Sequence, residues 1–433
     1  MTKIERMVYR AVRDHQGLKR KIRDAYQCIC DLIPTSGVRS AYQFAERRGF
    51  FFGFHDKSPF SMSDEFLLGH REATPLRMPR ADDHVGIGYF LGPEWLRFRE
   101  VCRTRAWNWH QGAMLQWLGA SGAFVFNDFV GNGHVTKVYD VKGVCRSVLP
   151  APIGAVSPDG SKALSYDFVR SNRGMPGYGY ANGSDPDSDK LIPSRRGLSV
   201  LDVSSGRVDL LYGVERLARI EPEESMAGCF HWVTHCQFSP SGERFGFFHR
   251  WVDERSGSRW TRMFSSSVDG TGLHLFPTTR MVSHFGWRDD RHVVAYARTR
   301  QFDDQYYLFR DLSGEFEVIG AGVFTSDGHP SISRDGRWMI TDTYPDAFRR
   351  QYLILFDLKE RIRYDLASFK LPSKFVGSGP GDHWTVDLHP RWNRESTVVC
   401  FDCGYSGTRS LCTLALGELN GNSPLAIKTW KAA

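Results

Sequence analysis

Short apolar runs separated by polar turns fill the chain from about residue 48 onward. A recurring unit consists of a short strand, a polar turn and then a strongly apolar strand. The clearest turns are Ser-Pro-Asp-Gly, Ser-Pro-Ser-Gly and Ser-Arg-Asp-Gly, at residues 157–160, 239–242 and 333–336. Weaker copies lie at residues 61–64, 119–122, 287–290 and 393–396. Pro presets φ, Asp bonds its own backbone and Gly takes positive φ, so these residue types favour tight turns.

These seven copies indicate a ring of like units. Several units continue into a further strand, as in the segments LSVLDV, YLILFDL and SLCTLAL. Four strands per repeat are typical of a β-propeller blade, and radial closure protects the edges of many small sheets. A β-sandwich would not produce seven like units. We therefore predict an all-β, seven-bladed β-propeller over residues 48–433.

The first part of the chain, residues 1–47, has a different pattern, which predicts a basic amphipathic helical extension. Apolar residues recur here every three to four positions, as expected for one or two helices. Basic residues lie between them, namely Lys3, Arg6, Arg10, Arg13, Lys19, Arg20, Lys21 and Arg23. Three interpretations stay open: a helix docked on the propeller, a solvated extension, or peripheral contact of residues 1–34 with an anionic membrane surface.

Composition narrows the classes of partner. The net charge of +7 favours anionic partners such as nucleic acid, anionic lipid or acidic polysaccharide. The basic residues form no recognised nucleic-acid module, so no nucleic-acid partner is expected. The aromatic content of 13% fits stacked sheets and also sugar-binding surfaces. Oligomeric state is not predicted by any of these features.

The cysteines and the apolar runs indicate a cytoplasmic protein. Nine cysteines are scattered along the chain, and the Cys400–Cys403 pair lies within an apolar strand pattern, which favours reduced packing thiols. The first thirty residues lack the apolar core of a secretory signal, and no run reaches the ~18 apolar residues of a membrane span. We expect a cytoplasmic location, with membrane association as the open alternative. Phosphate-binding loops, dinucleotide fingerprints, nucleophile elbows and zinc-protease helices are absent from the sequence.

Histidines recur at one position of the repeat. His235, His329 and His389 each lie four residues before a blade turn, and His284 lies three residues before Trp287. In a propeller the first strand of each blade lines the central channel, so these side chains should meet at one channel mouth. Neutral imidazoles from several blades can hold a divalent metal, or they can act as acid and base. The alternative is hydrogen bonding between blades.

Other polar and aromatic residues are expected at the same mouth. His249 and Tyr344 follow second strands and return to this face. Tyr178 and Tyr180, in a long insertion, can donate or accept a proton over the channel, and Trp109 can form a sugar platform or pack in the core. The arginines that can bind carboxylates include Arg170, Arg250 and Arg409. The polar stretch 54–59 is either catalytic or a turn into its blade.

Three stretches resemble blades of the oligogalacturonate lyases and of the similar ulvan lyases. They are residues 329–338, 235–242 and 387–392, and the resemblance extends over about residues 48–415. It implies β-elimination on a uronate-containing glycan. In that reaction the carboxylate is neutralised by a metal or by Arg or Gln, a base removes the C5 proton, and the leaving oxygen receives a proton.

The resemblance also implies roles for particular residues. By analogy with oligogalacturonate lyases, His235, His329 and His389 would bind Mn²⁺ or a similar ion, with His284 as a fourth ligand. Those enzymes add a Gln, but Gln237 alternates away from the face of His235. By analogy with ulvan lyases, proton transfer falls to His110, His134 and Tyr178, and carboxylate neutralisation to Arg250. The lack of an export signal and the basic N-terminal extension are departures from these families.

We therefore predict a carbohydrate-active propeller, a polysaccharide or oligosaccharide lyase that cleaves an acidic glycan at the channel mouth. The alternative is a non-catalytic propeller that binds glycan or partner proteins in cell-surface polysaccharide biosynthesis, such as capsule or exopolysaccharide formation. The candidate catalytic residues are His110, His134, Tyr178, Arg250 and His249. The candidate substrate-binding residues are Trp109, Arg170, Tyr180, Tyr344 and Arg409. The candidate metal ligands are His235, His284, His329 and His389, with no other cofactor.

Overall fold

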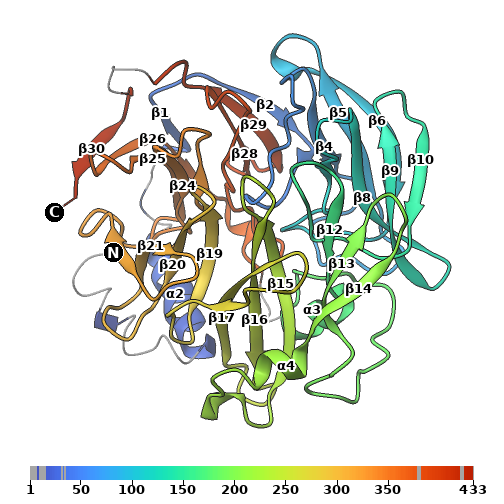
Figure 1. Ribbon diagram of the computed structural model, residues 1–433. Coiled ribbons are helices and arrows are strands. Elements are labelled where there is room, and N and C mark those ends of the chain that lie inside the picture. The colour runs from blue at the N-terminus through green and yellow to red at the C-terminus, as the bar shows by residue number, and fades with distance from the viewer. Residues whose placement is uncertain are drawn as a thin grey trace.

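The computed structural model is a seven-bladed β-propeller, as predicted (Figure 1). It describes residues 7–8, 16–30, 33, 36–377, 382–419 and 424–432. Within each blade all neighbouring strands are antiparallel, and the first strand of the blade is at one end of the sheet. The predicted turns at residues 119–122, 157–160, 239–242, 287–290, 333–336 and 393–396 connect the first strand of a blade to its second.

Five blades consist of four strands that are consecutive in the chain. Blade 1 contains β3 (Phe50–Phe51), β4 (Leu67–Arg71), β5 (Val85–Leu91) and β6 (Arg97–Thr104). Blade 2 contains β7 (Gln116–Trp117), β8 (Ala123–Val130), β9 (Gly133–Asp140) and β10 (Cys145–Leu149). Blade 3 contains β11 (Ala155–Val156), β12 (Lys162–Ser165), β13 (Gly197–Asp202) and β14 (Val208–Gly213). Blade 4 contains β15 (Phe230–Phe238), β16 (Arg244–Val252), β17 (Arg259–Ser267) and β18 (His274–Leu275). Blade 5 contains β19 (Val282–Trp287), β20 (His292–Ala297), β21 (Gln305–Arg310) and β22 (Phe316–Ile319).

The last two blades recruit strands from the ends of the chain. Blade 6 contains β23 (Ser331–Ile332), β24 (Trp338–Asp342), β25 (Arg350–Asp357) and β26 (Ile362–Lys370), and β26 also pairs with β1 (Val38–Ser40) and β30 (Lys428–Lys431). Blade 7 contains β27 (Arg391–Trp392), β28 (Val398–Cys403) and β29 (Ser410–Ala415), and β2 (Phe44–Arg48) completes it. The helical extension was predicted to run to residue 47, whereas the chain joins the propeller sheets at Val38. β1 and β2 are edge strands with partly exposed side chains, so their apolar periodicity is weak.

A buried carboxylate joins the first blade to the last. Asp402 on β28 accepts hydrogen bonds from the backbone N–H groups of Phe52 and Gly53, both at 3.0 Å. Asp402 also pairs with the guanidinium of Arg391, at 3.2 Å, and both side chains of this ion pair are about 1% exposed. Ring closure therefore depends on β2 and also on this charged contact beside the channel.

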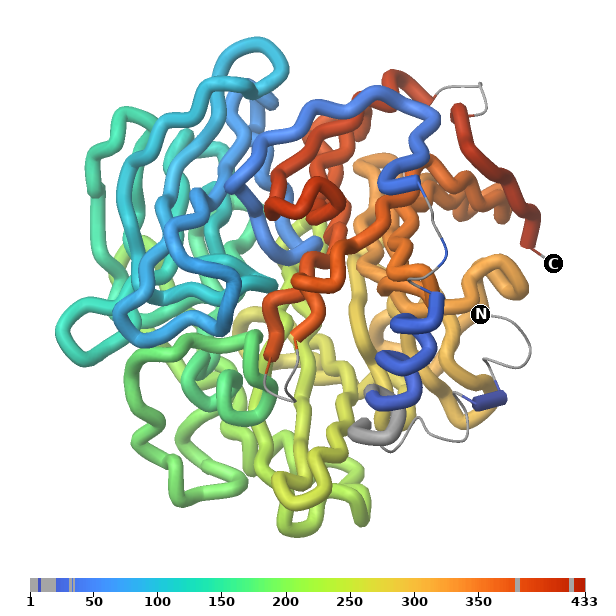
Figure 2. The backbone as a smooth tube through the Cα atoms, turned by 180° about the vertical axis from the view of Figure 1, so that it is seen from behind, coloured from blue at the N-terminus to red at the C-terminus, as the bar shows by residue number. Residues whose placement is uncertain are grey.

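The described helices are short and lie outside the sheets. They are α2 (Gln16–Cys30), α3 (Phe168–Gly174) and α4 (Val214–Ala218), with 3-10 turns η1 (Pro93–Trp95), η2 (Glu224–Met226) and η3 (Ser373–Phe375). Viewed from behind, α2 lies in front of the ring beside blade 6 (Figure 2). Gln27 fixes it there, donating to the carbonyl of Asp346 at 2.9 Å and accepting from Arg349 at 3.1 Å. In the described part of the chain, no helix has the length and apolar character needed to cross a membrane.

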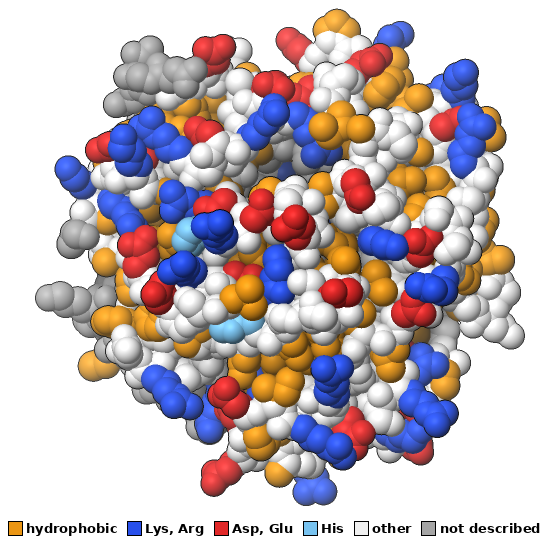
Figure 3. All heavy atoms as spheres, in the orientation of Figure 1, with side chains coloured by type: hydrophobic (Ala, Val, Ile, Leu, Met, Phe, Trp, Pro, Cys, Tyr) orange, Lys and Arg blue, Asp and Glu red, His pale blue; other side chains and the backbone are white. Residues whose placement is uncertain are grey.

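Part of α2 remains uncovered. Ile22, Tyr26 and Ile29 are 38%, 44% and 66% exposed, while Gln27 and Cys30 are buried against the propeller. The basic positions Lys3, Arg6, Arg10 and Arg13 lie outside the described residues. On the face of the molecule shown in Figure 3, Lys and Arg side chains are interspersed with Asp and Glu side chains. Contact between residues 1–34 and an anionic membrane stays a prediction.

Candidate functional site

An excursion of blade 1 enters the central channel. Phe51 on β3 pairs with His70, and Phe60 forms the next bridge, to Leu67, so residues 52–59 leave the sheet between them. This segment carries Phe54 and His55 into the channel, where both are buried. The polar stretch 54–59, which could have been only a turn into its blade, is therefore a channel-lining segment.

The four predicted histidines surround the ring of Phe54. Its centroid lies 4.9 Å from the ring of His235, 5.1 Å from that of His389, 5.9 Å from that of His284 and 6.1 Å from that of His329. All four histidines are at most 4% exposed. Seven repeats therefore bring residues from blades 4 to 7 to one place, as the spacing indicated.

Two of these histidines form the strongest candidate metal site. His329 and His389 have ring centroids 4.2 Å apart, and one ligand atom from each lies within 4.8 Å of a carboxylate oxygen of Asp387. The Nε2 atoms of both histidines and Oδ1 of Asp387 are buried and have no hydrogen-bond partner. Three residues at this spacing, each with a buried ligand atom that lacks a hydrogen-bond partner, fit a divalent cation. Asp387 was not predicted as a ligand, although its position two residues before His389 was a usable signal.

Neighbouring groups hold the two imidazoles in the ligand orientation. The Nδ1 of His329 is 2.7 Å from Oδ1 of Asp342, and the Nδ1 of His389 is 2.8 Å from the carbonyl oxygen of Gly53. Asp342 also accepts the backbone N–H groups of His329 and His389, at 2.8 and 3.0 Å. With both Nδ1 atoms engaged, each Nε2 is presented to the channel, an arrangement typical of metal-bound histidine.

Burial sets the charge state of this cluster. It lowers the pKa of His329 and His389 well below the usual range, and the neighbouring imidazoles lower them further. Both rings are therefore neutral, the form that binds metal. Burial raises the pKa of Asp387 to about 7, and the nearby Asp342 carboxylate adds to the shift.

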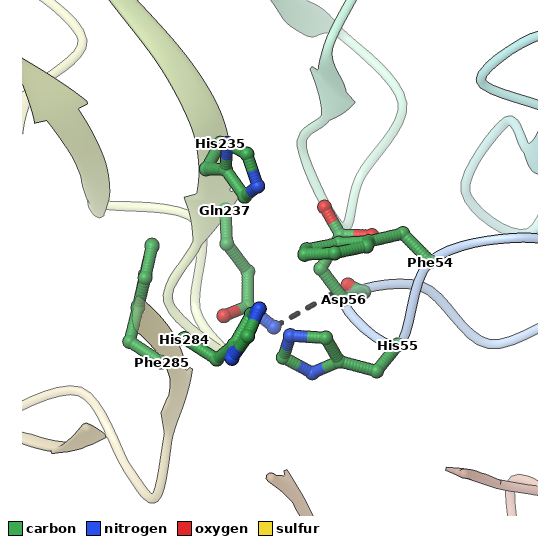
Figure 4. A pocket seen from close by; sticks show the side chains of 7 residues that line it. All are labelled: Phe54, His55, Asp56, His235, Gln237, His284 and Phe285. Carbon is green, nitrogen blue, oxygen red and sulfur yellow. Dashed lines mark hydrogen bonds between the residues drawn. The ribbon is translucent and has the colours of Figure 1, made fainter. Parts of the chain in front are cut away.

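His235 and His284 lie at a separate small cavity beside the metal candidates (Figure 4). This cavity has a volume of about 10 Å³, room for a single water molecule, and its lining also includes His55, Asp56 and Gln237. His284 is bonded through Nδ1 to Asp327 at 3.3 Å. Among the described residues, only the group of His329, His389 and Asp387 places three such ligand atoms within 4.8 Å of one another. The four-histidine metal site is therefore replaced by two histidines and a carboxylate.

Gln237 was placed on the wrong face by strand alternation. His235 has a positive φ of 57°, and the register of β15 with β16 shifts between Thr234 and Gln237. This bulge breaks the two-residue period, so His235 and Gln237 both line the cavity. Gln237 donates through Nε2 to the carbonyl of Asp56 at 3.3 Å, which leaves its own carbonyl oxygen buried without a partner.

His110 and Tyr178 form a stacked pair at the channel mouth. Their ring centroids are 4.6 Å apart and their planes differ by 6°. Nδ1 of His110 lies 3.6 Å from Oδ2 of Asp387, and neither ring nitrogen of His110 has a hydrogen-bond partner. Burial lowers the pKa of His110 well below the usual range and raises the pKa of Tyr178. A neutral imidazole thus lies against a phenol that keeps its proton.

Tyr344 is the predicted binding residue that reaches this mouth from blade 6. It is 37% exposed, and its ring lies 5.4 Å from that of His329 and 6.2 Å from that of His284. It follows the end of β24, as the sequence position indicated. An exposed aromatic ring at the rim of a polar site can contact a sugar face.

Three predicted aromatic and histidine positions are structural instead. Trp109 is 1% exposed and donates its indole N–H to the carbonyl of Arg77 at 2.6 Å, so it is part of the core. Tyr180 stacks on Phe168 with centroids 4.4 Å apart. The Nε2 of His134 is 2.8 Å from Oδ1 of Asn182, on the insertion between β12 and β13 of blade 3. In each case contacts with segments distant in the fold engage the side chain within the protein.

Two predicted arginines are also engaged by the protein itself. Arg170 pairs with Asp185 at 3.0 Å and donates to the carbonyl of His231 at 2.7 Å, which fixes α3 against blade 4. Arg409 donates to the carbonyls of Trp384 and Thr385 at 2.9 and 3.1 Å. Arg170 is therefore held by the protein itself, whereas Arg409 keeps a buried Nε without a hydrogen-bond partner.

His249 belongs to a buried hydrogen-bond chain inside blade 4. Its Nδ1 accepts from Nε of Arg262 at 3.1 Å, so its Nε2 carries the proton and donates to Nδ1 of His231 at 3.0 Å. His231 then donates from Nε2 to the carbonyl of Met226, at 3.2 Å. The chain needs both rings neutral. His249 therefore has a packing role in place of the predicted catalytic one.

This hydrogen-bond chain predicts that the free energy of unfolding decreases at acid pH. Burial lowers the pKa of His231 to about 4, below the ordinary value of 6.5, so its contribution to stability is complete above pH 6.5 and is lost as the pH falls toward 4. One such group changes the free energy of unfolding by about 1.4 kcal/mol per pH unit in that window. When the pH is lowered from about 6.5 to 5.5, we expect the free energy of unfolding of His231→Gln to decrease less than that of wild type. Urea unfolding at each pH measures the difference. Identical pH dependence in the two proteins would contradict this assignment.

The comparisons with known proteins support the fold. No family model matches the sequence, and no curated relative matches it. An oligogalacturonate lyase from Vibrio parahaemolyticus shares the fold with a TM-score of 0.59 and 13% identity, over 89% of this chain and 99% of the other. An oligogalacturonate lyase in complex with manganese matches to the same extent. A puromycin-hydrolysing peptidase from Mycobacterium tuberculosis gives a TM-score of 0.48 at 12% identity, over 87% of this chain and 56% of the other. The propeller fold is thus one that this chain shares with these two lyases.

Proposed function

We propose that this protein is a carbohydrate lyase that cleaves a uronate-containing glycan by β-elimination at the channel mouth. The observation that carries the proposal is the stacked His110–Tyr178 pair, in which Nδ1 of His110 lies 3.6 Å from Oδ2 of Asp387, a member of the buried His329–His389–Asp387 cluster. A proton-transfer pair beside a cation site provides the two functions that β-elimination next to a carboxylate needs.

The side chains have complementary roles in this proposal. His329, His389 and Asp387 would hold the divalent cation, which supplies positive charge to the substrate carboxylate and acidifies the C5 proton. His110 is neutral and has free ring nitrogens, so it can accept that proton. Tyr178 has a raised pKa and holds its proton, so it can donate it to the leaving oxygen. Tyr344 offers a ring surface at the rim.

A screen of uronic-acid glycans for unsaturated products tests the proposal. We expect wild-type protein to release an unsaturated uronate from at least one acidic glycan, and chelator to suppress the reaction. Tyr178→Phe is expected to lower kcat by about 10²–10⁴-fold, because it removes the proton donor and keeps the ring. Tyr180→Phe serves as the matched control, because Tyr180 lies in the same insertion as Tyr178.

The screen also separates the alternative function. Tight binding of an acidic glycan without any unsaturated product would favour a non-catalytic propeller in surface polysaccharide biosynthesis. Equal loss of activity in Tyr178→Phe and Tyr180→Phe would remove Tyr178 from the chemistry. A cytoplasmic location stays a prediction in either case.

A further inference from the structure

Two arginines on blade 4 point to an additional ligand. Arg250 on β16 pairs in register with Thr261, and Val252 pairs with Arg259 on β17. Positions two residues apart share one face of a strand, so both guanidinium groups lie on the same side of the sheet. Arg250 is only 5% exposed, and the Nε atoms of both arginines are buried without a hydrogen-bond partner.

The surroundings of Arg250 contain no counter-charge at contact distance. Its Nη1 donates to the sulfur of Met175 at 2.7 Å, and its guanidinium lies 5.2 Å from the ring centroid of Phe248. Over the described ranges, neither Arg250 nor Arg259 has a carboxylate within ion-pair distance. Two buried arginines elsewhere in the propeller differ, because Arg244 pairs with Asp311 at 2.8 Å and Arg391 with Asp402 at 3.2 Å.

The two positive charges also oppose each other. Burial, and then the proximity of Arg259, lowers the pKa of Arg250 to about 10, and burial lowers the pKa of Arg259. A desolvated charge without a partner is costly, and a like charge beside it adds to the cost. Such a pair is stabilised when an anion enters between the guanidinium groups.

The location connects this pair to the proposed chemistry. Met175, whose sulfur contacts Arg250, also accepts the backbone N–H of Tyr178 at its carbonyl oxygen, at 3.1 Å. Tyr178 is the ring that stacks on His110. The arginines therefore lie beside the proton-transfer pair, on the blade 4 side of the mouth.

We propose that Arg250 and Arg259 form an anion subsite that binds a carboxylate or a sulfate ester on a second sugar of the substrate. The assignment to substrate rests on the proposed lyase function, because the His329–His389–Asp387 cluster would take the carboxylate of the sugar that is cleaved. The binding of an anion does not rest on it. Together the two sites define a substrate with at least two anionic groups.

Met175 occupies the acceptor position that the anion would take. It follows α3, and its half-buried thioether is a weak acceptor on a side chain with three rotatable bonds. A bound oxyanion would displace this sulfur from Nη1 of Arg250 and accept stronger, charge-assisted hydrogen bonds.

Thermal unfolding with small anions tests the subsite without a cleavage assay. Wild type, Arg259→Gln, Arg259→Lys and the exposed control Arg255→Gln are compared in sodium acetate, sodium methyl sulfate and, at matched ionic strength, sodium chloride. We expect acetate or methyl sulfate to raise the Tm of wild type and of Arg255→Gln above the chloride value. Arg259→Gln should start with a higher Tm in chloride, because the repulsion is relieved, and should lose the anion response. Arg259→Lys should retain part of that response.

The outcomes separate the ligand classes and the two proposals. The probe that gives the larger rise identifies the group, carboxylate or sulfate ester. The subsite is overturned if neither anion stabilises wild type beyond chloride, or if Arg259→Gln responds as wild type does. An anion response without lyase activity on any uronate glycan would sink the proposed function and leave the subsite standing.

Discussion

His329→Ala is expected to abolish stoichiometric binding of a divalent metal. His329 supplies one of three ligand atoms that lie within 4.8 Å of one another, and its ring is held by Asp342 with Nε2 toward the channel. Loss of even an outer-shell partner typically costs 10–100-fold in metal affinity, so loss of this ligand should cost at least about 100-fold. Elemental analysis of protein loaded with Mn²⁺, followed by titration, measures the effect.

The matched control is His292→Ala, because His292 is a partly exposed histidine bonded to Asp289 on blade 5, away from the channel. Chelator should lower the Tm of loaded wild type and of this control, and should leave the Tm of His329→Ala unchanged. If His329→Ala unfolds, His389→Asn provides the second test. Metal content equal to wild type in both folded variants would exclude the site.

Asp402→Ala is expected to have the second large effect, a decrease of about 3–5 kcal/mol in the free energy of unfolding. The substitution removes the acceptor of the Phe52 and Gly53 amides and leaves Arg391 as a buried charge without its carboxylate. A buried ion pair that loses one partner is among the most destabilising changes known. Chemical unfolding followed by tryptophan fluorescence measures the change.

Asp209→Ala provides the comparison, since Asp209 forms an exposed ion pair with Arg207 at 2.9 Å. Exposed pairs contribute about 0–1 kcal/mol, so this variant should unfold close to wild type. Similar stabilities for Asp402→Ala and Asp209→Ala would show that the blade 1–blade 7 contact does not hold the ring closed.

The fold could be predicted from the sequence because each repeat contains a recognisable turn followed by an apolar strand. Turns such as 157–160 and 333–336 combine Ser, Asp and Gly at fixed places, and each is followed by an apolar strand. The closing strand β2 carried no such signal. Three of the five residues in its sequence, FAERR, are charged, and only its pairing with β29 makes it a strand.

The candidate site could be predicted only in part. The spacing of histidines within the repeat gives their position along the channel, but it does not identify the residues that they contact there. His329 and His389 were placed correctly at a shared mouth, but the third candidate ligand is Asp387, a carboxylate that the histidine pattern ignores. Gln237 was misplaced because a bulge at His235 interrupts the two-residue period of the strand. His235 adopts a positive φ of 57°, and its residue type gives no indication of such a bulge. Trp109 and Tyr180 were misplaced because long-range packing decides whether an aromatic ring is a platform or core.

Closure through β2 also has a consequence for synthesis on the ribosome. β2 emerges early, yet its partner β29 is among the last segments translated, so the nascent chain must carry an unpaired strand while six sheets form. The channel cluster needs Gly53 from the start of the ring and His389 from its end, joined by a hydrogen bond of 2.8 Å. A nascent chain that ends before blade 7 therefore cannot assemble the cluster, because Asp387 and His389 have not yet been translated.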